Sequence, residues 1–315
     1  MVQSHAAWIG LFIYMHELKF FRSPILASGL EYTETRELGI RKIMESISSK
    51  DGAPIACWNS GVGEPLLLVH GTSGDHFAWA SVLPALERQF SVWTIDRRGR
   101  GHSGDTDSYT LERECEDVAT VIDAIGSTVH LLGHSFGGLC ALEAALLTPN
   151  IGSLILYEPS ISLAGSGWSV ELEENMQSLL GASNREEALL LFFRDIVKTP
   201  PHEIAAMQTG SSWPGRIAAA HTIHRELCSI NQYIFDFRRF RAFQVPTLIL
   251  LGGESPPRRH LVAETLHRSL PDSQLAMLQG QQHSAMRTAP DLFVHEVVKF
   301  LNIHGSDALG GTDRL

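Results

Sequence analysis

Short apolar runs alternate with longer amphipathic runs along most of the chain from about Ile47 onward. Short apolar runs are typical of buried strands, whereas apolar residues spaced three and four apart, as in Leu111–Ile125, mark one face of a helix. The pattern predicts strands over residues 54–58, 66–69, 90–95, 129–132, 154–157, 247–251 and 274–278, and helices over 79–89, 111–125, 136–147, 259–270 and 290–301. Such alternation favours a doubly wound, mostly parallel α/β sheet.

The alternation stops between residues 160 and 243. This segment is rich in helix-forming residues, as in REEALLLFFRDIV, and has no convincing strand pattern. We therefore expect a helical insertion, or lid, over 160–243 within an α/β core formed by residues 46–159 and 244–303. The polar tail, residues 304–315, is expected to fray.

The N-terminal segment differs from the rest of the chain. Ala6–Met15 is apolar, but no Lys or Arg precedes it, as a secretory signal would require, and it is too short for a membrane span, which needs about 20 apolar residues. We expect residues 1–45 to be an extension, such as a helix packed on the domain or on a partner. A signal peptide is the alternative, because the length of the apolar run fits one.

Composition narrows the class of protein. The chain has 315 residues, of which 44% are hydrophobic, so it can bury a full core. The net charge of −10 argues against a nucleic-acid binder. The four cysteines lie far apart without a CxxC pair, so the sequence suggests neither a disulfide framework nor a zinc site. A reducing cytoplasm is the plainer location.

The strongest chemical signal is the sequence Gly133-His134-Ser135-Phe136-Gly137, a G-x-S-x-G motif that follows a predicted strand and precedes a predicted helix. A sharp turn at that point strains the central residue and crowds the backbone, which glycines at the flanking positions relieve. Ser135 is therefore the candidate nucleophile.

A serine hydroxyl needs a base to take its proton. Among the 15 histidines, His283 directly follows a predicted strand and precedes the last helix, so it is the candidate base. His134 is next to the nucleophile, but adjacent side chains at a turn point apart, so we do not expect it to be the base.

The loop His70-Gly71-Thr72 follows the predicted strand 66–69. Such a loop can donate a backbone N–H toward the serine, and an oxyanion hole needs two donors of this kind. The amides of Thr72 and Phe136 are the expected pair. The His70 ring is expected to hold the loop together.

Four segments match a known superfamily in order. They are HGTSG at 70–74, DRRGRGHSG at 96–104, GHSFGG at 133–138 and GQQHS at 280–284. The chain thus resembles the α/β-hydrolase superfamily over roughly residues 47–302, and the helical insertion stands at the family's lid position. The resemblance implies a Ser-His-acid triad and is much less specific about the substrate.

The third member of the triad departs from the commonest pattern. Many relatives have an aspartate at the position that Ser255 occupies here. Two glutamates offer a replacement: Glu254, one residue earlier, and Glu158, directly after the strand 154–157. Some family members are similar to the second arrangement, and a triad acid is defined by geometry and not by chain order. We favour Glu158 and keep Glu254 as the alternative.

The predicted activity is hydrolysis of a carboxylic ester or lactone of a small, fairly apolar molecule, of carboxylesterase or lactonase type, with no metal and no cofactor. Trp168, Phe192 and Trp213 in the insertion are the candidate substrate-binding residues. C–C bond hydrolysis, cofactor-free perhydrolysis and a non-enzymatic receptor that keeps the pocket are alternatives. We expect no nucleic-acid partner and no membrane span, and a homodimer is open.

Overall fold

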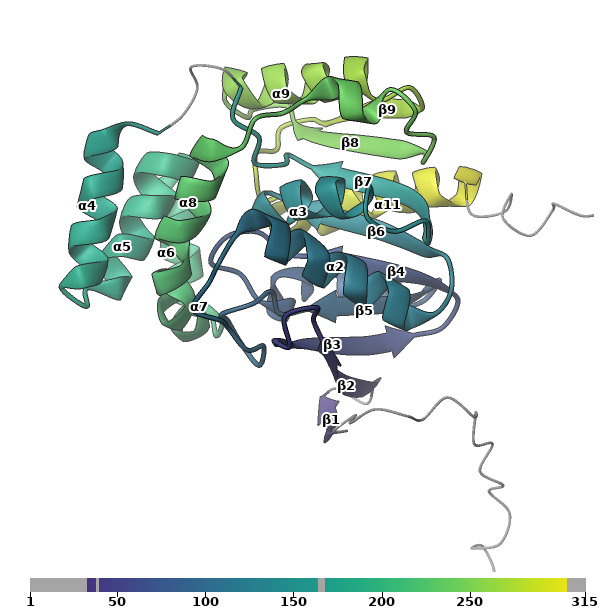
Figure 1. Ribbon diagram of the computed structural model, residues 1–315, viewed down its shortest axis with the longest axis horizontal. Coiled ribbons are helices and arrows are strands. Elements are labelled where there is room, and N and C mark those ends of the chain that lie inside the picture. Colours follow the sequence, from purple (N-terminus) through teal and green to yellow (C-terminus); the bar gives the residue numbers. More distant parts are fainter. Residues whose placement is uncertain (1–32, 38–39, 164–167, 305–315) are drawn as a thin grey trace, which may run out of the picture. The chain divides into compact units, whose positions relative to one another are not determined.

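The computed structural model describes residues 33–37, 40–163 and 168–304, all within one compact unit, residues 31–315 (Figure 1). In this part of the chain nine strands form one sheet in the order β1-β2-β3-β5-β4-β6-β7-β8-β9. The strands are β1 (Thr33–Glu37), β2 (Ile40–Ser48), β3 (Pro54–Gly61), β4 (Glu64–Val69), β5 (Phe90–Ile95), β6 (Val129–His134), β7 (Ile151–Tyr157), β8 (Thr247–Gly252) and β9 (Ser273–Leu278).

The sheet is parallel from β5 through β4, β6, β7 and β8 to β9, and the strands β1, β2 and β3 are antiparallel to their neighbours. The predicted mostly parallel α/β sheet is therefore confirmed, as is each predicted strand. The chain proceeds from β4 to β5 on one side and then crosses to β6 on the other. Ligands of such sheets bind beyond the carboxyl ends of the strands at this switch point.

Helices cover both faces of the sheet (Figure 1). They are η1 (His76–Trp79), α1 (Leu83–Leu86), α2 (Leu111–Ile125), α3 (Phe136–Ala144), α9 (Pro257–Ser269), α10 (Ala285–Thr288) and α11 (Pro290–His304). Along β4, Leu67 and Val69 pack with α2 and α3, whereas Leu66 and Leu68 pack with α1 and α11. Because both faces of β4 are buried, its apolar run is continuous and does not alternate.

Two predicted helices differ most from the observed elements, whereas α9 and α11 differ from their predicted bounds by one to three residues. The predicted helix 79–89 is two short pieces, η1 and α1, with Pro84 in the first turn of α1. Proline has no N–H to donate, so it begins a helix and does not continue one. The predicted helix 136–147 ends at Ala144, and tight turns follow in which Leu146 and Leu147 donate to carbonyls three residues earlier.

Between β7 and β8 the regular elements among the described residues are all helices. The elements are α4 (Val170–Gly181), α5 (Arg185–Leu191), the π-helical η2 (Phe192–Val197), α6 (Pro201–Gln208), α7 (Trp213–Ala219), η3 (Ala220–Thr222), α8 (Ile223–Gln232) and η4 (Phe237–Phe240). Figure 1 shows α4–α8 grouped together beside the sheet. We call residues 160–243 the helical insertion.

The expected N-terminal extension, residues 1–45, is wrong at its C-terminal end. Residues 33–37 form β1, and β2 pairs with β3 through Met44↔Trp58 and Ser46↔Ala56, so the sheet begins well before residue 46. An antiparallel strand near the edge of a sheet mixes polar and apolar residues, which weakens its signal in the sequence. The apolar run Ala6–Met15 lies outside the described residues. Among the described residues, no helix combines the length and the hydropathy that a membrane span requires.

Candidate active site

The predicted nucleophile lies at the turn from β6 into α3. Ser135 has a φ of 56° and a ψ of −123°, a conformation that L-residues rarely adopt. The flanking glycines are required by close contacts: a Cβ on Gly133 would lie 2.5 Å from the Gly137 carbonyl oxygen, and one on Gly137 would lie 2.3 Å from the His70 carbonyl oxygen. The turn therefore presents Ser135 at the carboxyl end of β6.

Hydrogen bonds hold Ser135 in place. Its backbone N–H donates to the Tyr157 carbonyl at 3.0 Å, and its hydroxyl shares a hydrogen bond with the Ser160 hydroxyl at 3.2 Å. Ser135 and His283 line the same cavity, but no hydrogen bond joins these two residues in the structure. In unliganded enzymes such a bond is often long and forms when substrate binds.

Glu158 and His283, the predicted acid and base, are in contact. The His283 Nδ1 lies 2.6 Å from the Glu158 Oε2, and the Glu158 carboxylate is fully buried. The other carboxylate oxygen, Oε1, accepts hydrogen bonds from the Gly252 N–H at 2.9 Å and the Ser255 hydroxyl at 2.5 Å. Arg259 Nε lies 3.2 Å from Oε2. A buried carboxylate with this many partners is held in one orientation.

The pKa values of the pair follow from these contacts. Burial by itself would raise the pKa of Glu158, but the hydrogen bond from His283 and the charge of Arg259 lower it to about 2. Burial, followed by the charge of Arg259, lowers the pKa of His283 to about 4, and Glu158 opposes this shift. Near neutral pH the carboxylate is therefore ionised and the imidazole is neutral, so the imidazole can accept a proton.

The alternative acid, Glu254, is exposed, and its backbone N–H donates to the Gln281 carbonyl at 2.9 Å. Its neighbour Ser255, which occupies the position where many family members have an aspartate, donates its hydroxyl to Glu158. The predicted acid, Glu158, therefore comes from the residue after β7. The loop after β8 contributes a hydrogen bond to its carboxylate.

The side chains of Tyr157 and His134 hold the loop that carries His283, a role that the sequence did not predict. The Tyr157 hydroxyl donates to the Gln282 carbonyl and accepts from the Ala285 N–H at 2.9 Å. His134 Nε2 lies 2.9 Å from the His283 carbonyl oxygen. His134 therefore supports the predicted base, in keeping with the expectation that it is not the base itself. The position of Tyr157 directly before Glu158 was the feature of the sequence that could have indicated its role.

The loop after β4 passes directly against Ser135. A Cβ on Gly71 would lie 2.8 Å from the Ser135 Cβ. His70 is buried, accepts the Arg97 N–H on Nε2 at 3.1 Å and contacts the Gly71 carbonyl through Nδ1 at 2.8 Å. This confirms that the His70 ring holds the loop together. Thr72 borders the same two cavities as Ser135, and Phe136 is the first residue of α3.

Two cavities meet at Ser135. The first, of about 80 Å³, is bordered by Trp168, Phe192 and the arginines Arg258 and Arg259. The second, of about 70 Å³, is bordered by Phe192, Met207, Met286, His283, Arg216 and Arg287. Both lie between the strand ends and the helical insertion. Trp168 and Phe192, two of the expected substrate-binding residues, therefore border a cavity that contains the predicted nucleophile.

Trp213 is the exception, because it borders neither of these cavities. Its ring is buried within the helical insertion, where it stacks on Phe193 with 6.3 Å between ring centroids and donates from Nε1 to Glu186 at 2.9 Å. The expectation that it binds substrate is corrected to a packing contact. An apolar face at helical spacing cannot distinguish these two environments.

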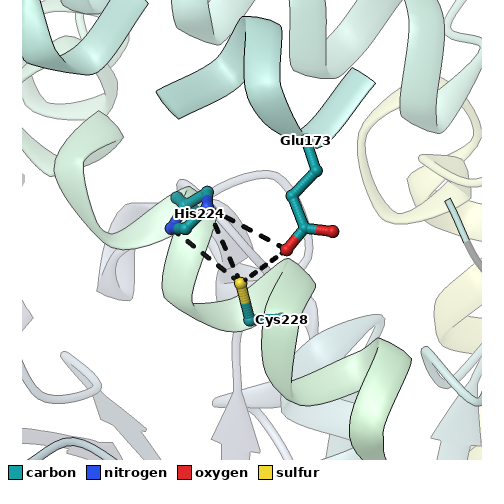
Figure 2. Close-up of side chains that lie close together, drawn as sticks. All are labelled: Glu173, His224 and Cys228. Carbon is teal, nitrogen blue, oxygen red and sulfur yellow. Dashed lines mark hydrogen bonds and ion pairs between the residues drawn. The ribbon is translucent and has the colours of Figure 1, made fainter. Parts of the chain in front are cut away.

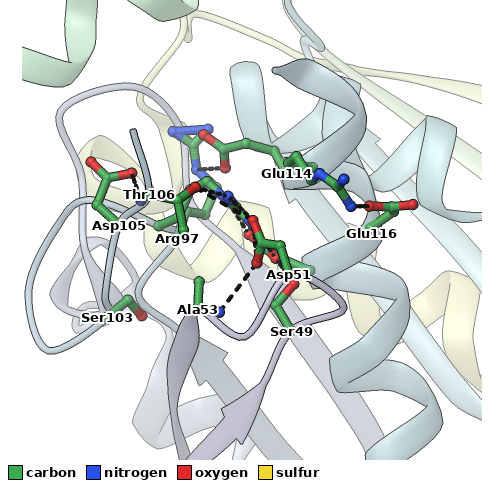
Figure 3. A network of polar contacts seen from close by, with 12 residues as sticks. Ser49, Asp51, Ala53, Arg97, Ser103, Asp105, Thr106, Glu114 and Glu116 are labelled. Atoms are coloured by element: carbon green, nitrogen blue, oxygen red, sulfur yellow. Dashed lines mark hydrogen bonds and ion pairs between the residues drawn. The ribbon is translucent and has the colours of Figure 1, made fainter. Parts of the chain in front are cut away.

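Buried charges tie the helical insertion to the core. Glu226 on α8 is fully buried and accepts from Arg97 at 2.6 Å, from Arg100, and from the Thr72 hydroxyl at 2.5 Å. The neighbouring Arg98 binds Asp117 and Asp51. Figure 3 shows Asp51, Arg97 and Glu114 in this network. Glu226 thus connects α8 both with the DRRGRG loop and with Thr72, the residue that is expected to donate to the oxyanion.

These contacts bring a serine, a histidine and a buried carboxylate together at the carboxyl ends of the parallel strands. The model of the alpha/beta hydrolase family matches residues 66–296, so the chain belongs to that family and is a hydrolase. A crystal structure of an alpha/beta hydrolase from Sphaerobacter thermophilus is 33% identical, with a TM-score of 0.73, and the match covers 81% of this chain and 99% of that one.

Relatives with functional names match most of the chain. A protein of Haemophilus influenzae named "Putative esterase/lipase" is 26% identical over 245 residues, 75% of this chain and 83% of the relative. A protein of Enterobacter cloacae named "Putative carbamate hydrolase RutD" is 26% identical over 254 residues, 77% of this chain and 89% of the relative.

Proposed function

We propose that the protein is a serine hydrolase that cleaves a carboxylic ester or lactone of a small, fairly apolar molecule. One observation carries the proposal: a buried Glu158–His283 hydrogen bond of 2.6 Å beside a cavity that Ser135 also borders. This is the arrangement that converts a weak hydroxyl nucleophile into an effective one.

In the proposed mechanism, the Ser135 hydroxyl attacks the carbonyl carbon of the substrate while His283 accepts its proton. His283 then gives that proton to the leaving alcohol, and an acyl-enzyme forms on Ser135. Water, deprotonated by His283, attacks the acyl-enzyme, and His283 returns the proton to the Ser135 oxygen as the acid is released. Glu158 fixes the imidazole in the orientation that presents Nε2 and stabilises its charged form.

The backbone N–H groups of Thr72 and Phe136 are proposed to stabilise the negative oxygen of the tetrahedral intermediate. Phe136 begins α3, where amide groups are free of intrahelical partners and the helix dipole favours negative charge. The loss of one such donor typically costs about 2.7–4 kcal/mol of transition-state stabilisation. The approach of Gly71 to Ser135 supports the participation of the neighbouring Thr72.

We propose that one cavity binds the acyl portion of the substrate and the other binds the alcohol portion. Phe192 borders both cavities. Trp168 gives the first cavity an aromatic wall, and the helical insertion would act as its lid. The relatives named for esterase and lipase activity support an ester substrate. The relatives named as carbamate hydrolases make a carbamate the second candidate, because the same attack applies to its carbonyl. The cytoplasmic location, and a homodimer, stay predictions.

The test compares wild type with Ser135→Ala on p-nitrophenyl acetate and butyrate. We expect a loss of about 10⁴-fold or more in kcat with unchanged thermal stability. Ser108→Ala, at an exposed serine that borders neither cavity, is the matched control and should keep full activity. Equal rates for wild type and Ser135→Ala would overturn the proposal.

Covalent labelling and a comparison of substrates test the alternatives, which are a non-enzymatic receptor and a carbamate hydrolase. Wild type should form one covalent adduct with an organophosphonate, located by mass spectrometry on Ser135. A non-enzymatic receptor would bind esters without turnover and without an adduct. Comparison of p-nitrophenyl esters with the matching carbamates then separates the two substrate classes, since the preferred substrate should have the higher kcat/KM.

A further inference from the structure

Three metal-ligating side chains converge in the helical insertion, away from Ser135. Glu173 lies in the first turn of α4, and His224 and Cys228 lie one helical turn apart on α8. Figure 2 shows the three side chains pointing toward one another across the space between the two helices. Residues four apart share one face of a helix, so α8 presents two ligands together to α4.

The distances have the size that a metal site requires. Cys228 Sγ lies 2.9 Å from Glu173 Oε1 and 3.7 Å from His224 Nε2, and His224 Nε2 lies 4.0 Å from Glu173 Oε1. Bonds to zinc of about 2.0–2.3 Å at tetrahedral angles place ligand atoms about 3.4–3.6 Å apart. Small side-chain adjustments would therefore bring all three atoms to coordination distance.

The surroundings also suit a metal ion. The second oxygen of Glu173, Oε2, accepts a hydrogen bond from the Asn231 amide at 3.5 Å, which leaves Oε1 directed at His224 and Cys228. Support of a ligating carboxylate by a neighbouring group is usual in metal sites. The side chains of His224 and Glu173 are 28% and 30% exposed, so an ion can enter and a water molecule can complete its coordination.

We propose that Glu173, His224 and Cys228 form a binding site for one divalent transition-metal ion, with zinc the best match, and that the ion joins α4 to α8. Thiolate, imidazole and carboxylate are each ligands that zinc accepts, and three protein ligands leave the fourth position for water. On binding, the Cys228 thiol loses one proton to solvent, while the neutral imidazole and the ionised carboxylate coordinate without losing one.

The site is independent of the proposed ester hydrolysis but close to it along α8. The same helix carries Glu226, which binds Thr72, and Leu227, which borders the first cavity. The ion would therefore stabilise the helix that forms one wall of the substrate site. The cysteine pattern could not reveal this, because two ligands come from α8 and the third lies 51 residues before His224.

The experiment titrates the full-length protein, first stripped of metal with a chelator, with zinc in a calorimeter. We expect one equivalent to bind. Cobalt titration should produce an absorption band from thiolate-to-cobalt charge transfer, which requires a cysteine ligand. Cys57, Cys115 and Cys140 are buried and Cys228 is partly exposed, so the band would report on Cys228.

Three variants and a control test the assignment. Cys228→Ser keeps a hydroxyl that can donate to Glu173, so its melting temperature without metal should match wild type. Its zinc affinity should fall by about 10- to 100-fold or more, and the cobalt band should vanish. His224→Ala and Glu173→Gln should also lose at least about tenfold in affinity. His221→Ala removes an exposed histidine of the same segment outside the trio and should bind zinc as wild type does.

Zinc should raise the melting temperature of wild type and not that of Cys228→Ser, because the ion binds only the folded state. Ser135→Ala should bind zinc like wild type, so the outcome does not depend on the proposed hydrolytic mechanism. The proposal is overturned if wild type binds no stoichiometric zinc, or if Cys228→Ser, His224→Ala or Glu173→Gln keeps wild-type affinity.

Discussion

The ends of the parallel strands and the helical insertion hold their functional side chains in different ways. At the strand ends, the backbone itself sets the geometry: Ser135 and Glu158 both have positive φ, at 56° and 43°, and each is hydrogen-bonded through its N–H to a neighbouring strand segment. In the insertion, Trp168 and Phe192 are positioned by packing among short helices, and one buried carboxylate, Glu226, ties α8 to the core.

This difference suggests that the strand ends carry the reaction, whereas the insertion selects the substrate. Strain and buried hydrogen bonds persist only where the surrounding structure enforces them, so the strand ends keep a reacting geometry to within a narrow range. Side-chain packing between short helices tolerates changes of shape at a smaller cost. We therefore expect substitutions at the strand ends to reduce turnover, and substitutions in the insertion to change stability or substrate affinity.

The largest effect is expected at the acid. Glu158→Gln removes the charge that orients and stabilises the His283 imidazole, so kcat should fall by about 10⁴-fold. Glu254→Gln, at an exposed carboxylate one position from Ser255, should stay within about twofold of wild type. The comparison is made by steady-state kinetics on one p-nitrophenyl ester. Loss of activity in Glu254→Gln alone would contradict the assignment of Glu158.

The next largest effect is expected where the insertion meets the core. Glu226→Gln leaves Arg97 and Arg100 buried with reduced charge compensation, so the free energy of unfolding should fall by about 3–5 kcal/mol. Chemical denaturation measures this change. Glu171→Gln, at an exposed position on α4, is the matched control and should change the unfolding free energy by no more than about 0.5 kcal/mol.

The two tryptophans of the insertion should respond in opposite ways. Trp213→Ala removes a buried ring, so the free energy of unfolding should fall by about 3 kcal/mol, with kcat/KM of the folded enzyme preserved. Trp168→Ala opens the wall of the first cavity, so KM for bulky esters should rise several-fold with little loss of stability. If Trp213→Ala instead raised KM at unchanged stability, its assignment to packing would be wrong.

The smallest effect is a shift in the pH profile. A general base must be neutral, so kcat/KM is retained above the pKa of His283 and lost as the pH falls through it, which places the acid limb near pH 4. Arg259→Gln removes the positive charge that lowers the pKa of His283, so the limb should move toward the ordinary histidine value of about 6.5. Arg268→Gln, exposed on the same helix, should leave the profile unchanged.

Much of the α/β core was predictable because its signals are local. The buried strands β4 to β8 appear as apolar runs, and the apolar spacing predicted α2 with its observed bounds. Thr110 caps the N-terminus of α2, and Gly126 ends it in a left-handed conformation. The strand β2 was missed because a strand near the sheet edge lacks a continuous apolar run. Its place is set by pairing with β3, which the local pattern does not encode.

The site was only partly predictable, because local patterns do not encode contacts between distant segments. Gly133 is required by contacts within the turn itself, so the motif identifies the turn directly, whereas Gly137 is required by its approach to the loop at His70. The sequence favoured Glu158 but left Glu254 open, because the distance of each glutamate to His283 depends on how β7 and β8 end in space. The roles of Tyr157, His134 and Ser160 likewise arise from contacts between distant segments.

The sequence by itself determined the family, the order of the strands from β3 onward and the position of the expected nucleophile, because periodicity and turn sterics act over a few residues. Only the tertiary structure decided that Glu158 meets His283, that Trp213 packs inside the insertion, and that Glu173 meets His224 and Cys228. Each of those contacts joins segments far apart in the chain. Their geometry follows from strand order and helix packing, which no local pattern specifies.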